Sequence, residues 1–213
     1  MAQGIFITLE GGEGVGKTTQ ISLLKDKLLA AGHDVITTRE PGGTPAAEAI
    51  RNLVSDDNLG ATLPPQAELM LFCAARASHI ADVIKPALEA GKIVICDRFI
   101  DSTRVYQGIL QSIDMDFIHQ LDARIVGDYM PDLTLVLDIP AEVAMERVQA
   151  RGARDHYDRG DLAFYERLRA GFLSLADQAP ERMKVIKADV EIEVIADTIW
   201  QYAANVIENN NDV

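Results

Sequence analysis

Eight residues near the N-terminus constrain the fold of this chain more than any other segment. They match the spacing G-x-x-x-x-G-K-[ST] and read Gly11-Gly12-Glu13-Gly14-Val15-Gly16-Lys17-Thr18. A short apolar run at residues 4–10 precedes them, and apolar residues at helical spacing follow over residues 18–31. The pattern predicts a strand, a turn and a helix whose first N–H groups surround a phosphate. The alternative, a glycine-rich turn that only caps a helix, is disfavoured by the flanking strand and helix.

The individual positions of this loop indicate a nucleoside triphosphate site. We expect Lys17 to reach the β and γ phosphates of ATP and the Thr18 hydroxyl to bind Mg²⁺, with Thr19 completing the ATP-binding residues. The motif leaves the reaction open, because GTPases, motor ATPases and kinases all carry it. The chain has no N-K-x-D guanine-reading motif, no L-S-G-G-Q segment and no apolar strand ending in Asp-Glu. These absences favour a small kinase.

Strand and helix patterns alternate along the whole chain. Strands are predicted at residues 4–10, rich in β-branched and aromatic residues, at 34–38, and at 93–97 and 133–138, whose continuous apolar runs are typical of strands covered on both faces, with a weaker copy at 183–187. Helical patterns lie between them at residues 18–31, 46–53, 65–88 with a break before Pro86, 117–126, 141–150, 161–176 and 190–207. The alternation predicts a P-loop NTPase fold, a three-layer α/β/α arrangement around a five-stranded parallel sheet. Residues 209–212 are expected to fray.

Length and composition limit the remaining possibilities. The 213 residues suit one domain spanning residues 1–213, and the net charge of −13 disfavours nucleic acid as a partner. The two cysteines, Cys73 and Cys96, form no C-x-x-C pair and no leader segment is visible, which suits reduced thiols in a cytoplasmic protein. No apolar run approaches the roughly 20 residues that a membrane span requires.

Phe72 and Arg76 are four residues apart in a predicted helix and therefore lie on one face. An aromatic ring beside a guanidinium can stack on a nucleobase and donate hydrogen bonds to a base carbonyl. Composition alone favours the alternative, in which Phe72 belongs to the core and Arg76 is a solvated charge.

Asp97 and Arg98 follow a buried strand, at the sheet edge where open α/β sheets bind ligands. We expect Arg98 to hold a phosphate, and Asp97 to hold Mg²⁺ through water or to orient the attacking oxygen. An ion pair within the protein is the alternative for this segment. Hydroxyl and amide groups suited to reading a sugar and a base edge follow at Ser102, Thr103, Tyr106 and Gln107.

Taken together, these segments closely resemble the bacterial thymidylate kinases, in order and over nearly the whole chain. The resemblance rests on Thr8-Leu9-Glu10-Gly11, Thr38-Arg39-Glu40-Pro41-Gly42-Gly43-Thr44, Leu71-Phe72-Cys73-Ala74-Ala75-Arg76, Asp97-Arg98-Phe99 and Ser102-Thr103 through Tyr106-Gln107-Gly108. It implies Mg²⁺-dependent transfer of the γ-phosphoryl group of ATP to dTMP, giving dTDP and ADP. It also implies a homodimer. The apolar stretch at residues 69–80 is a candidate for part of the interface, although the sequence does not separate interface from core.

The resemblance also implies roles for single residues. Lys17, Arg98, Arg151 and Asp97 would be the catalytic residues. Phe72 would stack on thymine, Arg76 would bond its O4 and Thr103 would contact the far edge of the ring. Tyr106 would disfavour ribose, Arg98 and Arg39 would hold the acceptor phosphate, and Glu10 would lie near the 3′-hydroxyl. Pro41, Ser102 and Gln107 would complete the acceptor site.

A short arginine-rich segment, at about residues 147–161, resembles the lid of this family. Because Glu13 gives the phosphate loop an acid rather than a cation, the chain resembles the members whose catalytic arginine lies in the lid. Arg151 is the first candidate for that role, and Arg147 is a candidate to stack on adenine.

The lid also departs from the family pattern of Asp-Arg, an aromatic residue and an acid. The ungapped counterpart is Asp155-His156-Tyr157-Asp158, so His156 stands where an arginine is expected. Asp158-Arg159 would restore the dipeptide only with a shift of the next helix. A neutral imidazole supplies less positive charge than a guanidinium, which motivates a rival interpretation as a nucleotide-binding protein that has lost its chemistry. The nearer rival is a kinase for another nucleoside monophosphate.

Overall fold

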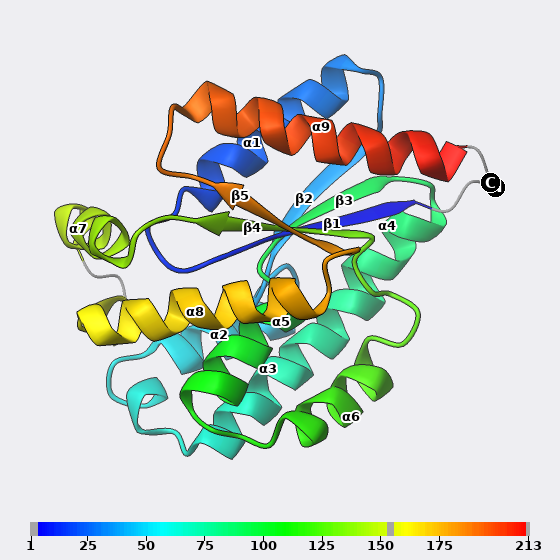
Figure 1. Ribbon diagram of the computed structural model, residues 1–213. Coiled ribbons are helices and arrows are strands. Elements are labelled where there is room, and N and C mark those ends of the chain that lie inside the picture. The colour runs from blue at the N-terminus through cyan, green and yellow to red at the C-terminus, as the bar shows by residue number, and fades with distance from the viewer. Residues whose placement is uncertain (1–3, 153–155, 212–213) are drawn as a thin grey trace.

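A parallel sheet of five strands lies at the centre of the computed structural model, which describes residues 4–152 and 156–211 (Figure 1). Its strand order is β2-β3-β1-β4-β5. The strands are β1 (Ile5–Glu10), β2 (Val35–Arg39), β3 (Ile93–Asp97), β4 (Leu133–Asp138) and β5 (Met183–Lys187). The five predicted strands are confirmed to within one residue at each end, because each combines β-branched residues with polar or glycine-rich boundaries.

Helices cover both faces of this sheet, which confirms the three-layer arrangement (Figure 1). α1 (Lys17–Ala30) and α9 (Ile192–Asn211) pack together on one face. The other face carries α4 (Lys85–Glu89) and α8 (Leu162–Gln178). The remaining elements are α2 (Pro45–Ser55), η1 (Gly60–Thr62), α3 (Pro65–His79), η2 (Ile80–Ile84), α5 (Ile100–Thr103), η3 (Arg104–Leu110), α6 (Met115–Ile125), α7 (Ala141–Arg151) and η4 (His156–Arg159).

The register of the sheet brings the carboxyl ends of three strands together. Asp97 at the end of β3 pairs with Leu9 of β1 on one side and with Arg39 of β2 on the other. The residues that follow these strands, Gly11, Glu40 and Arg98, therefore begin their loops at the same edge. This edge is where a parallel α/β sheet offers a binding crevice.

The apolar side chains of β1 form two core layers because they alternate between the faces of the sheet. Ile7 and Leu9 pack in the cluster shared with α1 and α9, whereas Phe6 packs with Val94 and Phe99 on the opposite face. All six residues of β1 are buried. Burial on both faces explains why this strand has a continuous apolar sequence.

Two sequence predictions about helices need correction, and one helical segment was not predicted. The break expected before Pro86 is a π-helical turn, η2, in which the Lys85 N–H donates to Ile80 O five residues back, and the helix continues. Residues 100–110 are helical, although their polar and β-branched residues gave no helical periodicity. α9 extends to Asn211, so residues 209–211 are helical rather than frayed.

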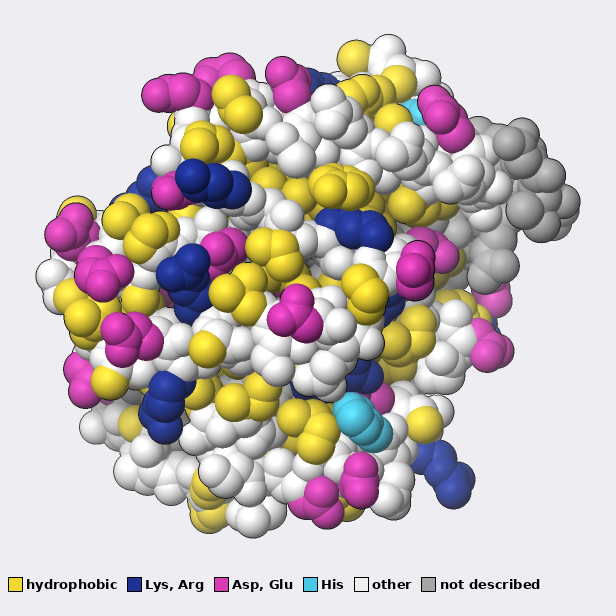
Figure 2. Space-filling view, viewed as in Figure 1, with side chains coloured by type: hydrophobic (Ala, Val, Ile, Leu, Met, Phe, Trp, Pro, Cys, Tyr) yellow, Lys and Arg dark blue, Asp and Glu magenta, His cyan; other side chains and the backbone are white. Residues whose placement is uncertain are grey.

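Charged side chains are mixed over the visible face in Figure 2, where Lys and Arg stand among acidic residues rather than in one patch. Cys73 and Cys96 are both buried free thiols. In the described ranges, no helix has the length and apolar character needed to cross a membrane.

Candidate active site

The phosphate loop connects β1 to α1 and turns on glycines. Gly11, Gly14 and Gly16 have φ values of 125°, 79° and 98°, which an L side chain rarely adopts. A Cβ on Gly14 would also lie 2.6 Å from the Ala144 carbonyl oxygen. The loop therefore requires glycine at these positions, and α1 begins at Lys17 with its N-terminal N–H groups directed to the loop.

Lys17 is held inside this loop. Its Nζ donates to the carbonyl oxygens of Gly11 at 3.0 Å and Gly12 at 2.8 Å. Burial and, next, the nearby Arg98 guanidinium lower the pKa of Lys17 to about 8, against the opposing effect of the nearby carboxylates. The ammonium is thus fixed beside the concavity where phosphate oxygens are expected.

A cavity of about 460 Å³ joins the phosphate loop to the acceptor residues predicted from the sequence. The loop contributes Glu13 to Thr18 and then Thr19, and the sheet edge contributes Asp97 and Arg98. The acceptor side contributes Arg39, Pro41, Phe72, Arg76, Ser102, Thr103, Tyr106 and Gln107. One cavity therefore adjoins both groups of residues, as transfer between two bound nucleotides requires.

Arg98 lies at the junction of the two halves. Its Nη2 donates to Glu13 Oε1 at 2.7 Å, and its Nη1 donates to Gly11 O at 3.0 Å and Ser102 Oγ at 3.1 Å. The guanidinium also lies 5.4 Å from the Tyr106 ring centroid. The Arg98 guanidinium is thus directed at the phosphate loop. Its pair with Glu13 is an ion pair within the protein, the alternative that the sequence left open for Asp97 and Arg98.

The Glu13 carboxylate is shared with Tyr106, whose hydroxyl donates to Oε1 at 2.6 Å and to Oε2 at 2.7 Å. Burial raises the pKa of Tyr106 well above its usual value, and the Glu13 carboxylate adds to this. The phenol therefore remains a hydrogen-bond donor at neutral pH.

Asp97 and Thr18 fit the expected Mg²⁺. Both line the cavity, and Asp97 Oδ1 is buried without a hydrogen-bond partner in the part of the chain that the structure describes. In the same residues, no three His, Cys, Asp or Glu side chains converge on one point. A donor set of one carboxylate and one hydroxyl suits Mg²⁺, which keeps several waters and uses substrate phosphates as further ligands.

The acceptor wall is built from α3, α5 and η3. Phe72 is partly buried and lines the cavity, outside the apolar core clusters, and Arg76 is 2% exposed and therefore not a solvated charge. Arg76 Nη2 donates to Thr103 Oγ1 at 2.8 Å. Gln107 Nε2 is buried with no hydrogen-bond partner among the described residues. These groups together present donors beside an aromatic surface.

Two predicted acceptor residues are engaged by other groups of the protein. Glu10 does not line the cavity: it is fully buried and accepts from the Phe99 N–H at 2.8 Å and from Ser102 Oγ at 2.6 Å. Burial and, next, the negative charge of Asp101 raise the pKa of Glu10 to about 7. Arg39 does line the cavity, but its Nη2 donates to both Glu48 oxygens, at 3.0 and 3.1 Å.

The segment predicted to be a lid begins in α7, and Arg147 and Arg151 line the cavity. Arg147 Nη1 donates to Gly14 O at 3.4 Å, and Arg151 Nη2 donates to Asp158 Oδ1 at 2.6 Å. Tyr157 and Asp158 also line the cavity. Arg154 and Asp155 lie outside the described residues, as does the side chain of His156.

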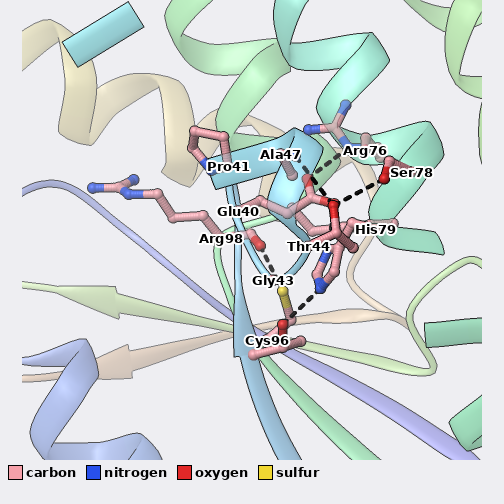
Figure 3. Close-up of polar contacts among 12 residues, drawn as sticks. Glu40, Pro41, Gly43, Thr44, Ala47, Arg76, Ser78, His79, Cys96 and Arg98 are labelled. Carbon is pink, nitrogen blue, oxygen red and sulfur yellow. Dashed lines mark hydrogen bonds and ion pairs between the residues drawn. The ribbon is translucent and has the colours of Figure 1, made fainter. Parts of the chain in front are cut away.

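Several residues at this site were not predicted from the sequence to belong to it. Tyr157 of η4 donates to Glu68 of α3 and packs edge-on against Tyr106, with ring centroids 6.1 Å apart. Arg51 lines the cavity and donates from Nη1 to Pro41 O at 2.9 Å. Glu40 belongs to a segment that the sequence singled out, but nothing in its spacing indicated that it contacts Arg76. In Figure 3, Arg76 and His79 point toward Glu40, whereas Arg98 points away from it.

Comparison with known proteins agrees with this geometry. The family model described as thymidylate kinase matches residues 9–199. A thymidylate kinase of Caulobacter vibrioides is 50% identical over 93% of this chain and 95% of that protein, and one of Nitrobacter winogradskyi is 47% identical over 93% and 87%. The crystal structure of thymidylate kinase from Ehrlichia chaffeensis superposes with a TM-score of 0.78 at 36% identity, over 94% of this chain and 99% of that one. The chain belongs to the thymidylate kinase family.

Proposed function

We propose that this protein transfers the γ-phosphoryl group of ATP to dTMP, giving dTDP and ADP for dTTP biosynthesis. The observation that carries the proposal is the single cavity lined by both the phosphate loop and the Phe72, Arg76, Thr103 and Gln107 wall. A kinase must bring two anionic nucleotides together, and Lys17 and Arg98, which line this cavity, would neutralise their phosphates. Family membership supports the same reaction.

The proposed mechanism requires no protein nucleophile, because the acceptor phosphate is itself the attacking anion. Lys17 binds the phosphates of ATP, and Arg98 with Arg39 binds the acceptor phosphate. To do so, each arginine shares its donors with, or releases, its carboxylate partner, Glu13 or Glu48. Catalysis then consists of alignment and neutralisation of charge on the transferring group.

We propose that Thr18 and Asp97, the latter through water, hold Mg²⁺ at this site. When bound, the metal ion neutralises charge on the phosphates. The buried Asp97 Oδ1 supports this assignment, since it lacks a donor among the residues that the structure describes.

We further propose that residues 147–161 act as a lid within a one-domain protein, with Arg151 as its catalytic cation and Arg147 beside the adenine. Both arginines line the cavity on the side of the phosphate loop. In the structure Arg151 pairs with Asp158, whose side chain is only 3% exposed.

We also propose a cytoplasmic homodimer, as the family resemblance implies. Leu69, Cys73 and Ile80 are buried within the protomer and do not form the interface. Met70 on α3 is 40% exposed and remains available for it. Light scattering on the purified protein tests the association: a mass of one chain at micromolar concentration would refute it.

The decisive experiment is an ADP-release assay with ATP and Mg²⁺ and one acceptor at a time. We expect dTMP to give the highest kcat/KM among dTMP, dUMP, dCMP and dAMP. A higher value for another acceptor would establish a different nucleoside monophosphate kinase. Tight binding of ATP and dTMP without turnover would indicate a nucleotide-binding protein that has lost its chemistry.

A further inference from the structure

Glu40 lies behind the acceptor wall and contacts Arg76 directly. Arg76 Nε donates to Glu40 Oε2 at 2.8 Å, and the two side chains are 3% and 5% exposed. The other carboxylate oxygen, Oε1, lies 3.1 Å from Nδ1 of His79, which is fully buried. Both oxygens of one buried carboxylate are therefore engaged, one by the guanidinium and one by the imidazole (Figure 3).

His79 is itself fixed from the opposite side. Its Nε2 lies 2.6 Å from Thr38 Oγ1, so both ring nitrogens have partners. The loop after β2 closes over this ring: a Cβ on Gly43, which has φ 83°, would lie 2.6 Å from His79 Cδ2 and 2.8 Å from Thr38 Oγ1. Because both ring nitrogens and both carboxylate oxygens have partners, Thr38, His79 and Glu40 form a hydrogen-bonded relay that ends at Arg76.

The relay fixes a guanidinium that is also held by two other groups. Arg76 lies 5.2 Å over the Phe99 ring, and its Nη2 donates to Thr103. Nη1 has no hydrogen-bond partner among the described residues, and Asp122 Oδ1 lies 4.0 Å from it. Without Glu40, the nearest carboxylate to Arg76 would be Asp122, which would draw the guanidinium toward α6 and away from its present orientation.

The direction of this guanidinium matters because arginine donates hydrogen bonds and never accepts them. A fixed donor at the base wall favours a carbonyl oxygen and opposes an amino group at the same ring edge. A guanidinium free to turn would lose that discrimination, since it would no longer direct an N–H at one point.

We propose that Glu40 and His79 are positioning residues that orient Arg76 and thereby set the preference for an acceptor base with a carbonyl oxygen, as in dTMP and dUMP, over one with an amino group, as in dCMP. This inference rests on the proposed function. It assigns the Glu40 carboxylate a role in acceptor specificity, beyond that of neutralising a buried charge.

The test compares Glu40→Gln with the unchanged protein. Gln keeps the shape of Glu40 but removes the negative charge of the carboxylate. Its amide NH₂ also faces one of the two donors, Arg76 Nε or His79 Nδ1. We expect KM for dTMP and dUMP to rise together, while KM for ATP and the affinity for dCMP, measured as a competitor, stay unchanged. The preference for dTMP over dCMP should fall at least about tenfold, the size expected for one charged hydrogen bond.

Matched variants separate positioning from stability. Asp132 caps the opposite end of β1 by accepting from the Phe6 N–H at 2.7 Å, so Asp132→Ala should lower Tm without changing the acceptor preference. His79→Asn keeps a donor near the position of Nδ1 and should retain most of the preference, whereas His79→Leu should lose it. Thr38→Val, which removes only the hydroxyl, should cause a smaller loss.

An unchanged dTMP to dCMP preference in Glu40→Gln would overturn the proposal and leave Glu40 a stabilising residue only. If Glu40→Gln fails to fold, equal preferences in His79→Asn and His79→Leu would overturn it instead. Absence of dTMP turnover in the unchanged protein would refute the proposed function. The inference about Glu40, which rests on that function, would then be refuted with it.

Discussion

Arg98 and Glu13 form an ion pair across the site, with Arg98 Nη2 2.7 Å from Glu13 Oε1 and side chains that are 19% and 13% exposed. The pair joins the end of β3 to the phosphate loop. Arg98, which we propose binds the acceptor phosphate, therefore also supports the loop. This double role makes its guanidinium difficult to replace.

We expect Arg98→Lys to raise KM for dTMP by at least about tenfold and to raise KM for ATP much less. A lysine keeps the charge but cannot hold Gly11, Ser102 and Glu13 at once, and loss of a charged hydrogen bond costs about 1.5–3 kcal/mol. Steady-state kinetics with each nucleotide varied in turn provide the measurement. Equal increases in both KM values would show that Arg98 acts mainly by supporting the loop.

Arg151→Ala should lower kcat by more than about a hundredfold and leave the dissociation constant of dTMP near that of the unchanged protein, as expected for loss of a catalytic arginine. Arg167→Ala is the matched control, because Arg167 is an exposed arginine on α8 and its loss changes the net charge equally. Single-turnover kinetics separate the chemical step from product release. A kcat within a few-fold of the unchanged value would exclude Arg151 as the lid cation.

His156→Arg should leave kcat equal or higher, because it restores a guanidinium where the family pattern has one. The measurement is kcat at saturating ATP and dTMP, alone and combined with Arg151→Ala. Partial recovery in the double variant would show that position 156 can supply the charge. A large loss in the single variant would show that the imidazole has a role of its own.

Because Lys17 is buried, we predict that it takes up a proton when ATP binds above pH 8. Burial and the Arg98 charge lower the pKa of Lys17 to about 8, and bound phosphates would raise it again. ATP affinity should therefore be flat below this pH and fall about tenfold per pH unit above it. Calorimetry at pH 8.5 in buffers of different ionisation enthalpy measures the uptake directly. Equal apparent enthalpies in all buffers would contradict it.

Glu10 predicts a pH-dependent stability difference. Its pKa is raised from 4.5 to about 7, mainly by burial, so between these values the folded protein binds a proton that the unfolded chain has released. Its contribution to the free energy of unfolding therefore falls as pH rises from 4.5 to 7, by on the order of 3 kcal/mol. Glu10→Gln removes this pH-dependent loss of stability, because the amide does not ionise and can still form a hydrogen bond with Ser102.

Urea unfolding of both proteins at pH 5, 6, 7 and 8 tests this directly. The stability of Glu10→Gln relative to the unchanged protein should rise with pH and level off above about pH 7. A difference that does not vary with pH would mean that Glu10 is ionised throughout this range.

Much of the fold was predictable because its signals are local. Short runs rich in apolar and β-branched residues identified all five strands, and the spacing of Gly11, Gly16 and Lys17 located the phosphate loop between β1 and α1. The structure adds the helix caps Thr44 and Asp161, whose side chains accept from N–H groups three residues later. The helix over residues 100–110 was not predictable, because tertiary packing stabilises it against its weak local pattern.

The sequence alone determined which chemical groups this protein has, including the loop glycines, Lys17, Asp97 and the arginines. Only the tertiary structure decided which of them meet. Arg98 pairs with Glu13 across 85 residues, and Arg76 pairs with Glu40 across 36, because strand order and register bring the ends of β1, β2 and β3 to one edge. The sequence gives the type of each residue, but only the fold determines which residues contact one another. The same register buries Glu10 behind Ser102 and places Glu40 against the arginine proposed to read the base.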